Sequence, residues 1–332
     1  MNHLRLCLGL FLASAAFAAQ SATSFPMGGL AVKINAGSIA APVSTSFAIP
    51  LYDPPLAIGA GVGRIASLTA TTITCTGAGW TSGALSTPAF PYAFRITSGG
   101  ATGATFYVSA NTADTLTTSG VDLLSQGLAA GASGDTFRLI PVDTLNTLFG
   151  ATTLMGGPSP AEADIVVLSS NSQASYYYDP GAGQWRRPGL PLNFGDTKIP
   201  LDSAVTVVRR SSALTLRFTG RVPDVRFRLA VANSGSTYTH TGFPTEVTLG
   251  NLSLQTTLPG WVSGADTNAD ILVVGIGSSA PAYYHDGTQW SRPGIPLKFD
   301  GTKIPAGTPI QIFKRGSSSG TSYLTQFIPY SL

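Results

Sequence analysis

The sequence contains few residues that form covalent cross-links. Among its 332 residues are two cysteines. Cys7 lies in the N-terminal apolar segment, so a mature exported chain would keep only Cys75 and could form no intrachain disulfide. Cys75 belongs to an alternating run of threonines with no histidine, lysine or arginine nearby, which favours a small residue on a strand over a reactive thiol. The fold must therefore be stabilised by a buried core.

Catalytic and metal-binding patterns are also scarce. His240 and His285 lie in neither HExxH nor His-x-His spacing, so we expect no metal and no cofactor. No Gly-x-Ser-x-Gly elbow stands between a strand and a helix, and the Gly-Ser-rich runs 275–279 and 316–320 are typical of turns. We therefore expect no enzyme, although paired carboxylates leave a glycoside hydrolase open as an alternative. The aspartates that cluster in the sequence are Asp164, Asp179, Asp196, Asp202 and Asp224.

Charge is low and evenly spread. Charged side chains make up 11% of the chain, with 19 basic and 16 acidic residues. Proteins that bind nucleic acid carry a basic stripe that neutralises phosphates, and this chain has none. We expect no nucleic-acid partner.

The only notable apolar run is N-terminal. Residues 1–18 combine Arg5, an apolar run from Leu6 to Ala16 and a small-residue end before Ala19, which predicts a secretory signal peptide. The apolar run is shorter than the roughly 20 residues that a membrane-spanning helix needs. We therefore expect a protein without a membrane span that is secreted and is extracellular, at the cell surface or in the periplasm.

Glycine, threonine, serine and proline are plentiful and separate short alternating segments. Apolar and polar residues alternate with period two in 204–208 and 309–314, among several others, and no long helical periodicity occurs. The pattern predicts an all-β protein, with short helical turns chiefly in 121–129 and 142–148.

One segment occurs twice. Trp185–Pro200 (WRRPGLPLNFGDTKIP) and Trp290–Pro305 (WSRPGIPLKFDGTKIP) share 11 of 16 residues at an offset of 105. At an offset of 106, Ala163-Asp164-Ile165 matches Ala269-Asp270-Ile271, and Tyr177-Tyr178 matches Tyr283-Tyr284. Each copy is predicted to form a strand ending in Tyr-Tyr, a hairpin turn, and a strand beginning at Trp. Such a duplication indicates two modules of one design.

These observations predict tandem, duplicated β-sandwich or barrel-like modules with an inserted small β-barrel near the N-terminus. Both copies continue to a basic pair, Arg209-Arg210 or Lys314-Arg315, and to a closing strand in which Phe218 or Phe327 is expected to be buried. The predicted divisions are a signal peptide (1–18), N-terminal strands (19–60), an inserted β domain (61–140), β repeat 1 (141–236) and β repeat 2 (237–332).

Several motifs resemble a bacterial protein family. They are Gly77–Trp80, Pro91–Gly99, Ala110–Leu116 and Gly134–Phe137, followed by Tyr-Tyr-Tyr, Trp-Arg-Arg and Val-Val-Arg-Arg. Together they resemble an uncharacterised family of secreted, repeat-containing all-β bacterial proteins. The resemblance implies export and a shared β fold. That family has no assigned activity, so the resemblance implies no functional residue.

The repeated aromatic and arginine residues are the candidate ligand site. Tyrosine and tryptophan offer flat surfaces on which sugars stack, and arginine offers a fork of donors. The alternative is that the same residues only pack across a hairpin, with arginine stacked on a ring. The candidates are Tyr177, Tyr178, Trp185, Arg187, Tyr283, Tyr284, Trp290 and Arg292.

The sequence favours a non-catalytic secreted structural or adhesive protein of the cell surface or extracellular matrix, able to self-associate. A carbohydrate-binding protein that uses the duplicated Tyr, Trp and Arg surfaces is the alternative, and a glycoside hydrolase comes third. The expected partners are extracellular polysaccharide or other envelope proteins.

Overall fold

The computed structural model describes residues 26–53, 62–128, 134–169, 173–316 and 319–331. The expected signal peptide, residues 1–18, lies outside this range. The described chain forms 24 strands and three helices of four or five residues. The predicted all-β class is therefore confirmed.

No helix in the described part of the chain is long and apolar enough to cross a lipid bilayer.

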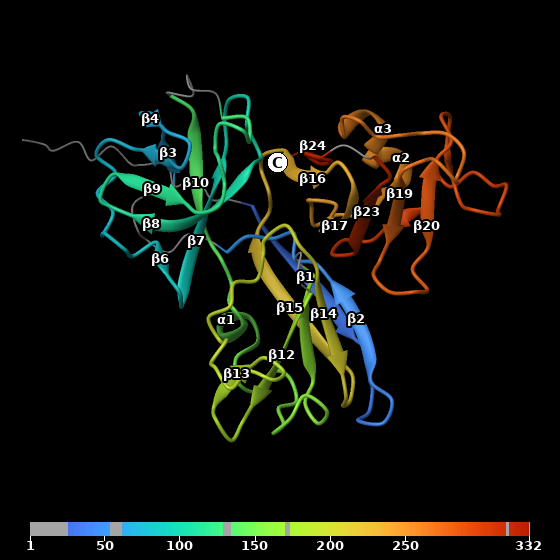
Figure 1. Ribbon diagram of the computed structural model, residues 1–332, viewed down its shortest axis with the longest axis horizontal. Coiled ribbons are helices and arrows are strands. Elements are labelled where there is room, and N and C mark those ends of the chain that lie inside the picture. Colours follow the sequence, from blue (N-terminus) through green and yellow to red (C-terminus); the bar gives the residue numbers. More distant parts are fainter. Residues whose placement is uncertain (1–25, 54–61, 129–133, 170–172, 317–318, 332) are drawn as a thin grey trace, which may run out of the picture.

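Three lobes meet near the centre of the molecule (Figure 1). We name them module 1 (26–53 and 142–223), the insert domain (62–141) and module 2 (224–331). The chain leaves module 1 after its first two strands, builds the insert domain, and returns to complete module 1 before entering module 2.

Module 1 is built on a five-stranded antiparallel sheet and a separate strand pair. The sheet has the order β13 (Gln184–Arg186), β12 (Ala174–Asp179), β11 (Ile165–Leu168), β14 (Val205–Arg209) and β2 (Val43–Phe47). The pair consists of β1 (Met27–Ile34) and β15 (Leu214–Arg221). The N-terminal strands thus complete the two sheets of module 1.

Module 2 has the same strand order. Its five-stranded sheet runs β21 (Trp290–Ser291), β20 (Ala282–His285), β19 (Ile271–Val274), β23 (Pro309–Lys314) and β17 (Gly235–His240). Its separate pair is β16 (Phe227–Ala232) with β24 (Thr321–Gln326), and a short pair joins β18 (Val247–Thr248) to β22 (Lys303–Ile304). Because β16 pairs with β24, the strands of module 2 begin ahead of residue 237.

The insert domain is one curled sheet of eight strands. Its order is β3 (Val62–Arg64), β10 (Thr136–Pro141), β7 (Phe90–Ile96), β8 (Thr105–Asn111), β9 (Thr115–Thr118), β5 (Thr72–Thr74) and β4 (Ser67–Leu68), with β6 (Ser86–Thr87) beside β7. Its two outer strands do not pair with one another in the described chain, so the sheet is open where a closed barrel was expected. Its core contains an aromatic cluster in which Phe94 and Phe137 are fully buried.

Both modules contain short helices. Helix α1 (Leu145–Phe149) lies in the expected region, and the Thr144 side chain caps its N-terminus. Helices α2 (Leu249–Leu252) and α3 (Leu254–Thr257) were not expected, and Thr248 caps α2 in the same way. Residues 123–127 form turns.

The two closing strands differ in their phenylalanines. Phe218 on β15 is half-buried and stacks on Phe47 with 5.7 Å between ring centroids. Phe327 is 68% exposed, so its expected burial is wrong. Strand β24 ends at Gln326, and alternation along it points Leu324 and Gln326 inward. The Gln326 amide donates to the carbonyl of Leu252 at 2.8 Å, so a polar side chain takes the last inward position.

Candidate functional site

Both repeated tryptophans lie inside the cores of their modules. Trp185 is 1% exposed and Trp290 is completely buried. Trp185 meets the edge of Tyr178 across the hairpin at 5.8 Å and lies 5.9 Å from Phe149 of α1. Trp290 meets His285 at 5.6 Å in the same way. Neither indole ring offers a face on which a ligand could stack.

Strand pairing shifts the correspondence between the repeated tyrosines by one residue. Tyr178 pairs with Trp185, whereas the partner of Trp290 is His285. The equivalent of Tyr283 is therefore Tyr176, which the sequence comparison left out. Both are buried, at 6% and 4% exposure, and pack on a phenylalanine of the following loop. Aligning the strands on Asp179 and Asp286 would have revealed this, because the second hairpin turn is two residues shorter.

The remaining candidates do not form one surface with the tryptophans. Tyr177 points to the opposite face of β12 and is buried with Ile165, while Tyr284 is half-buried. Arg292 lies over the Tyr283 ring, 5.6 Å from its centroid, as a cation–π contact. Arg187 is half-buried, and a backbone bridge links it to Leu190. The structure thus gathers these residues around packed hairpins.

Each module contains a buried ion pair that the sequence comparison did not identify. Asp164 is 1% exposed, pairs with Arg209, and accepts hydrogen bonds from the backbone of Met155 at 2.7 Å and Arg210 at 2.6 Å. In module 2, Asp270 pairs with Lys314 at 3.3 Å and accepts from the backbone of Val262 and Arg315, both at 2.8 Å. The first residue of each basic pair, Arg209 or Lys314, is therefore buried and pairs with a buried carboxylate.

The other clustered aspartates are held by separate partners. Asp179 pairs with Arg186 at 3.2 Å, and Asp224 pairs with Arg138 at 2.6 Å. Asp196 accepts from the amide of Asn146 at 3.2 Å. The different carboxylates thus stabilise different local structures.

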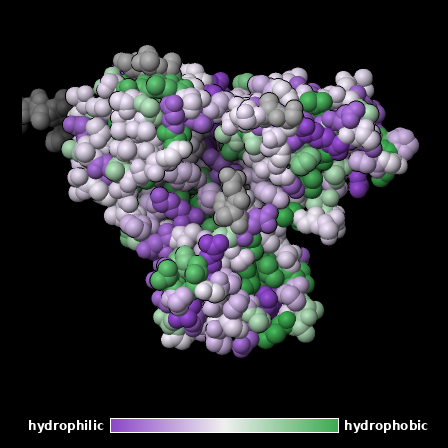
Figure 2. All heavy atoms as spheres, in the orientation of Figure 1, coloured by the Kyte–Doolittle hydropathy of each residue, from purple (hydrophilic) through white to green (hydrophobic). Residues whose placement is uncertain are grey.

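The loop after each tryptophan exposes two aliphatic side chains. We name residues 188–192 aliphatic loop 1 and residues 293–297 aliphatic loop 2. Leu190 and Leu192 are 43% and 62% exposed, and Ile295 and Leu297 are 36% and 62% exposed. A glycine with positive φ shapes the turn in each loop, at φ 77° for Gly189 and 74° for its counterpart. Figure 2 shows hydrophobic patches on the lobe of module 1, among side chains of mixed character.

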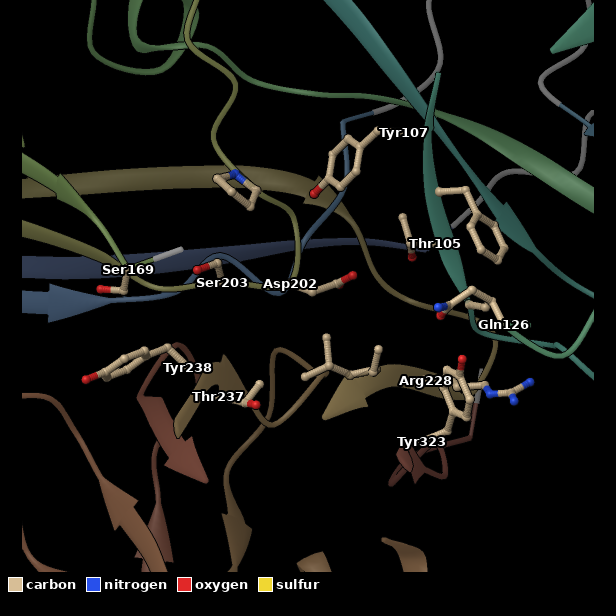
Figure 3. A pocket seen from close by; sticks show the side chains of 15 residues that line it. Thr105, Tyr107, Gln126, Ser169, Asp202, Ser203, Arg228, Thr237, Tyr238 and Tyr323 are labelled. Carbon is tan, nitrogen blue, oxygen red and sulfur yellow. The ribbon is translucent and has the colours of Figure 1, made fainter. Parts of the chain in front are cut away.

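A second kind of site lies where the three lobes meet. We name it the junction cleft, and its volume is about 560 Å³. All three lobes line it, so it exists only in the assembled chain. Figure 3 shows polar and tyrosine side chains lining it from both sides. The polar and aromatic lining residues are Thr105, Phe106, Tyr107, Gln126, Ser169, Asp202, Ser203, Arg228, Thr237, Tyr238 and Tyr323.

A buried arginine holds one wall of the junction cleft in place. Arg95 on β7 is 2% exposed, its guanidinium lies 3.0 Å from Asp202 of module 1, and its Nε donates to Thr105 at 2.8 Å. Arg95 also donates to the hydroxyl of Tyr52 and stacks over that ring at 4.3 Å. Burial raises the pKa of Tyr52 to about 12, so this hydroxyl stays protonated at neutral pH.

Module 2 is joined to the insert domain along the other wall. Arg228 on β16 donates to the carbonyl of Gly100 at 3.0 Å and lies 4.4 Å from the centroid of the Tyr323 ring. The Tyr323 hydroxyl donates to the carbonyl of Ser125 at 3.1 Å. Contacts among all three lobes thus hold the walls of the cleft in a fixed arrangement.

A second cleft, of about 480 Å³, lies between module 1 and the end of the insert domain. Asp53 and Asp143 both line it. Asp53 is exposed at its rim, yet partial desolvation and the nearby charge of Asp143 raise its pKa to about 6. Desolvation also raises the pKa of Asp143. The set of aspartates selected from the sequence contains neither residue, because they are 90 positions apart.

His240 lies buried beside the junction and is 1% exposed. Its Nδ1 accepts from the backbone of Gly242 at 2.9 Å, so its Nε2 carries the proton and donates to the carbonyl of Leu201 at 3.1 Å. Burial lowers the pKa of His240, an effect that the charge of Arg95 reinforces and that of Asp202 opposes. The folded protein therefore favours a neutral imidazole here.

This burial predicts acid sensitivity. The unfolded chain protonates His240 near its usual pKa of 6.5, so its stabilising contribution is complete above that pH and is lost as the pH falls towards the lower folded pKa. Between about pH 7.5 and about pH 5, the melting temperature of the wild type should therefore fall more steeply than that of His240→Gln. Calorimetry at a series of pH values measures both slopes.

The raised pKa of Asp53 acts in the opposite direction, since its contribution is present at low pH and is lost as pH rises through about 6. Asp53 is present in both the wild type and His240→Gln, so its effect cancels when the two are compared. Parallel curves for the wild type and His240→Gln would contradict the prediction.

Comparison with known proteins gives no match to a family model, to a curated protein or to a solved structure.

Proposed function

We propose that this chain is a non-catalytic, secreted structural or adhesive protein of the cell surface or extracellular matrix, which assembles with copies of itself through aliphatic loops 1 and 2. The observation that carries the proposal is the repetition of exposed aliphatic residues. Packing explains why both copies keep a buried tryptophan. It does not explain why both copies keep two aliphatic side chains in water.

Neighbouring positions show how freely this segment varies. Asn193 in the first copy corresponds to Lys298 in the second, and the Gly-Asp at 195–196 is reversed to Asp-Gly at 300–301. Leu192 and Leu297 are identical and are both 62% exposed. An exposed aliphatic pair held on a proline-flanked turn favours contact with another apolar surface.

The valency of the chain favours assembly. One aliphatic loop belongs to module 1 and the other to module 2, so each chain presents two equivalent patches on different lobes. Two patches per chain allow growth beyond a dimer, whereas one patch used isologously closes at two copies. With 19 basic and 16 acidic residues, the copies repel each other only weakly.

Removing the loops one at a time tests this proposal. We expect wild-type protein to form concentration-dependent oligomers larger than dimers in sedimentation velocity. Leu190→Ser/Leu192→Ser and Ile295→Ser/Leu297→Ser should each stop at dimers, and the four-residue variant should be monomeric. Because the side chains are exposed, each substitution should change the free energy of unfolding by only about 0.5 kcal/mol.

The matched control is Ile39→Ser, an aliphatic residue with 59% exposure outside both loops. It should assemble like the wild type. A wild-type protein that stays monomeric at all concentrations, or loop variants that assemble normally, would overturn the proposal.

A further inference from the structure

We propose that the junction cleft binds a neutral oligosaccharide chain, at a site separate from the aliphatic loops. The inference goes beyond assembly, because the cleft uses other residues and needs only one copy of the protein. It rests on the shape of the cleft, its polar groups and its charge balance.

The cleft is elongated and has a tyrosine near each end. Figure 3 places Tyr238 with Ser169 at one end, and Tyr323 with Gln126 and Arg228 at the other. Tyr238 lies on β17 and Tyr323 on β24, so both rings belong to module 2 while the opposite wall comes from the other two lobes. Flat, rigid rings of this kind stack on the C–H faces of sugar units. Two rings apart from each other suit a chain of several units.

Polar groups between the rings match sugar hydroxyls. Asp202 uses Oδ1 to pair with Arg95, and no described residue donates to its Oδ2. Gln126 offers an amide that both donates and accepts, and Ser169 and Thr237 offer hydroxyls. Pocket polar groups of this kind fix the orientation of a ligand whose remaining surface is covered by rings and aliphatic side chains.

The lining of the cleft carries one carboxylate, that of Asp202, and one guanidinium, that of Arg228. The carboxylate of Asp202 lies 3.0 Å from the guanidinium of Arg95, and Arg228 is engaged with the Tyr323 ring and the Gly100 carbonyl. A phosphate or a polyanion would meet the Asp202 carboxylate in the middle of the cleft. A neutral ligand meets no such repulsion, which favours it over a charged one.

The full-length mature protein can be titrated by calorimetry with neutral gluco-, manno-, xylo- and galacto-hexaoses. We expect at least one of them to bind with a stoichiometry of one per chain. Tyr238→Ala should weaken that binding about tenfold, which corresponds to about 1.4 kcal/mol. Tyr238 is the most informative residue to change, because its removal breaks few contacts within the protein. Among the described residues, its hydroxyl accepts only a 3.4 Å hydrogen bond from Gln173.

The matched control is Tyr284→Ala. Tyr284 is also a half-buried strand tyrosine, but it lies outside the cleft and belongs to the repeated aromatic set. It should leave affinity unchanged, as should Leu192→Ser and Leu297→Ser, so failure of assembly and failure of saccharide binding are separable. Melting curves of each variant identify any loss of folded protein.

Three results would overturn the inference. The first is no binding of any of the four neutral hexaoses. The second is binding that Tyr284→Ala abolishes and Tyr238→Ala leaves intact. The third is binding confined to an anionic polysaccharide such as polygalacturonate, or to an extended peptide such as a polyserine 10-mer.

Discussion

Trp185→Ala is expected to lower the free energy of unfolding by about 3 to 5 kcal/mol. The ring of Trp185 is 1% exposed and packs on both Phe149 of α1 and Tyr178 of β12, so its removal leaves a cavity between the helix and the hairpin. The protein would lose both the favourable free energy of burying the indole and the van der Waals contacts that the ring makes. Denaturant unfolding, followed by fluorescence of the remaining tryptophans, measures the change.

Matched variants separate packing from other causes. Trp185→Phe keeps an aromatic ring and should lose much less than alanine. The indole N–H of Trp185 has no hydrogen-bond partner among the described residues, so phenylalanine gives up no polar contact. Trp290→Ala should match Trp185→Ala, because Trp290 is equally buried. A change below about 1 kcal/mol for Trp185→Ala would show that the hairpin does not depend on this ring.

The all-β class could be predicted because strand alternation and turn residues are local signals. In β14, for example, alternating valines are followed by a Ser-rich turn, and no partner is needed to recognise the pattern. Pairing between strands distant in sequence is a different matter. Nothing local indicates that Met27–Ile34 lies beside Leu214–Arg221, because about 190 residues separate them and the chain builds another lobe in between.

The candidate site shows the same limit. Repetition identified Trp185 and Trp290 correctly as equivalent residues, but repetition alone cannot distinguish a buried ring from an exposed one. Tyr177 was matched to the wrong residue of the second copy because three consecutive tyrosines in the first copy correspond to only two in the second. Residue type alone therefore did not determine which residues are equivalent. The strand partners of Trp185 and Trp290, which are Tyr178 and His285, determine which residues of the two copies correspond.

The junction cleft could not be predicted because its residues come from three lobes. Tyr107, Asp202 and Tyr238 are separated by 95 and 36 positions and share no motif. Arg95 holds Asp202 at this wall, and it is the one charged residue of β7, whose other six residues are aromatic, aliphatic or proline. Only the neighbouring lobes reveal that this arginine pairs with Asp202 and stacks on Tyr52.

Asp164→Asn is expected to lower the free energy of unfolding by about 3 to 5 kcal/mol. The substitution keeps the size of the side chain but removes the charge that balances Arg209, which is 7% exposed. It also replaces an oxygen with an NH₂ group. Asp164 accepts from two backbone N–H groups through different oxygens, so one of these donors would face another donor.

A double-mutant cycle with Arg209→Met isolates the charge effect. Removing Asp164 alone leaves an uncompensated buried guanidinium, whereas removing both charges leaves none, so the double variant should be more stable than Asp164→Asn. Asp270→Asn provides the equivalent test in module 2, where Lys314 is 3% exposed. Asp196→Asn is the surface control and should stay within about 0.5 kcal/mol, because Asp196 is exposed. If Asp164→Asn also stayed within that range, the two buried pairs would not stabilise the modules, and their repetition would need another explanation.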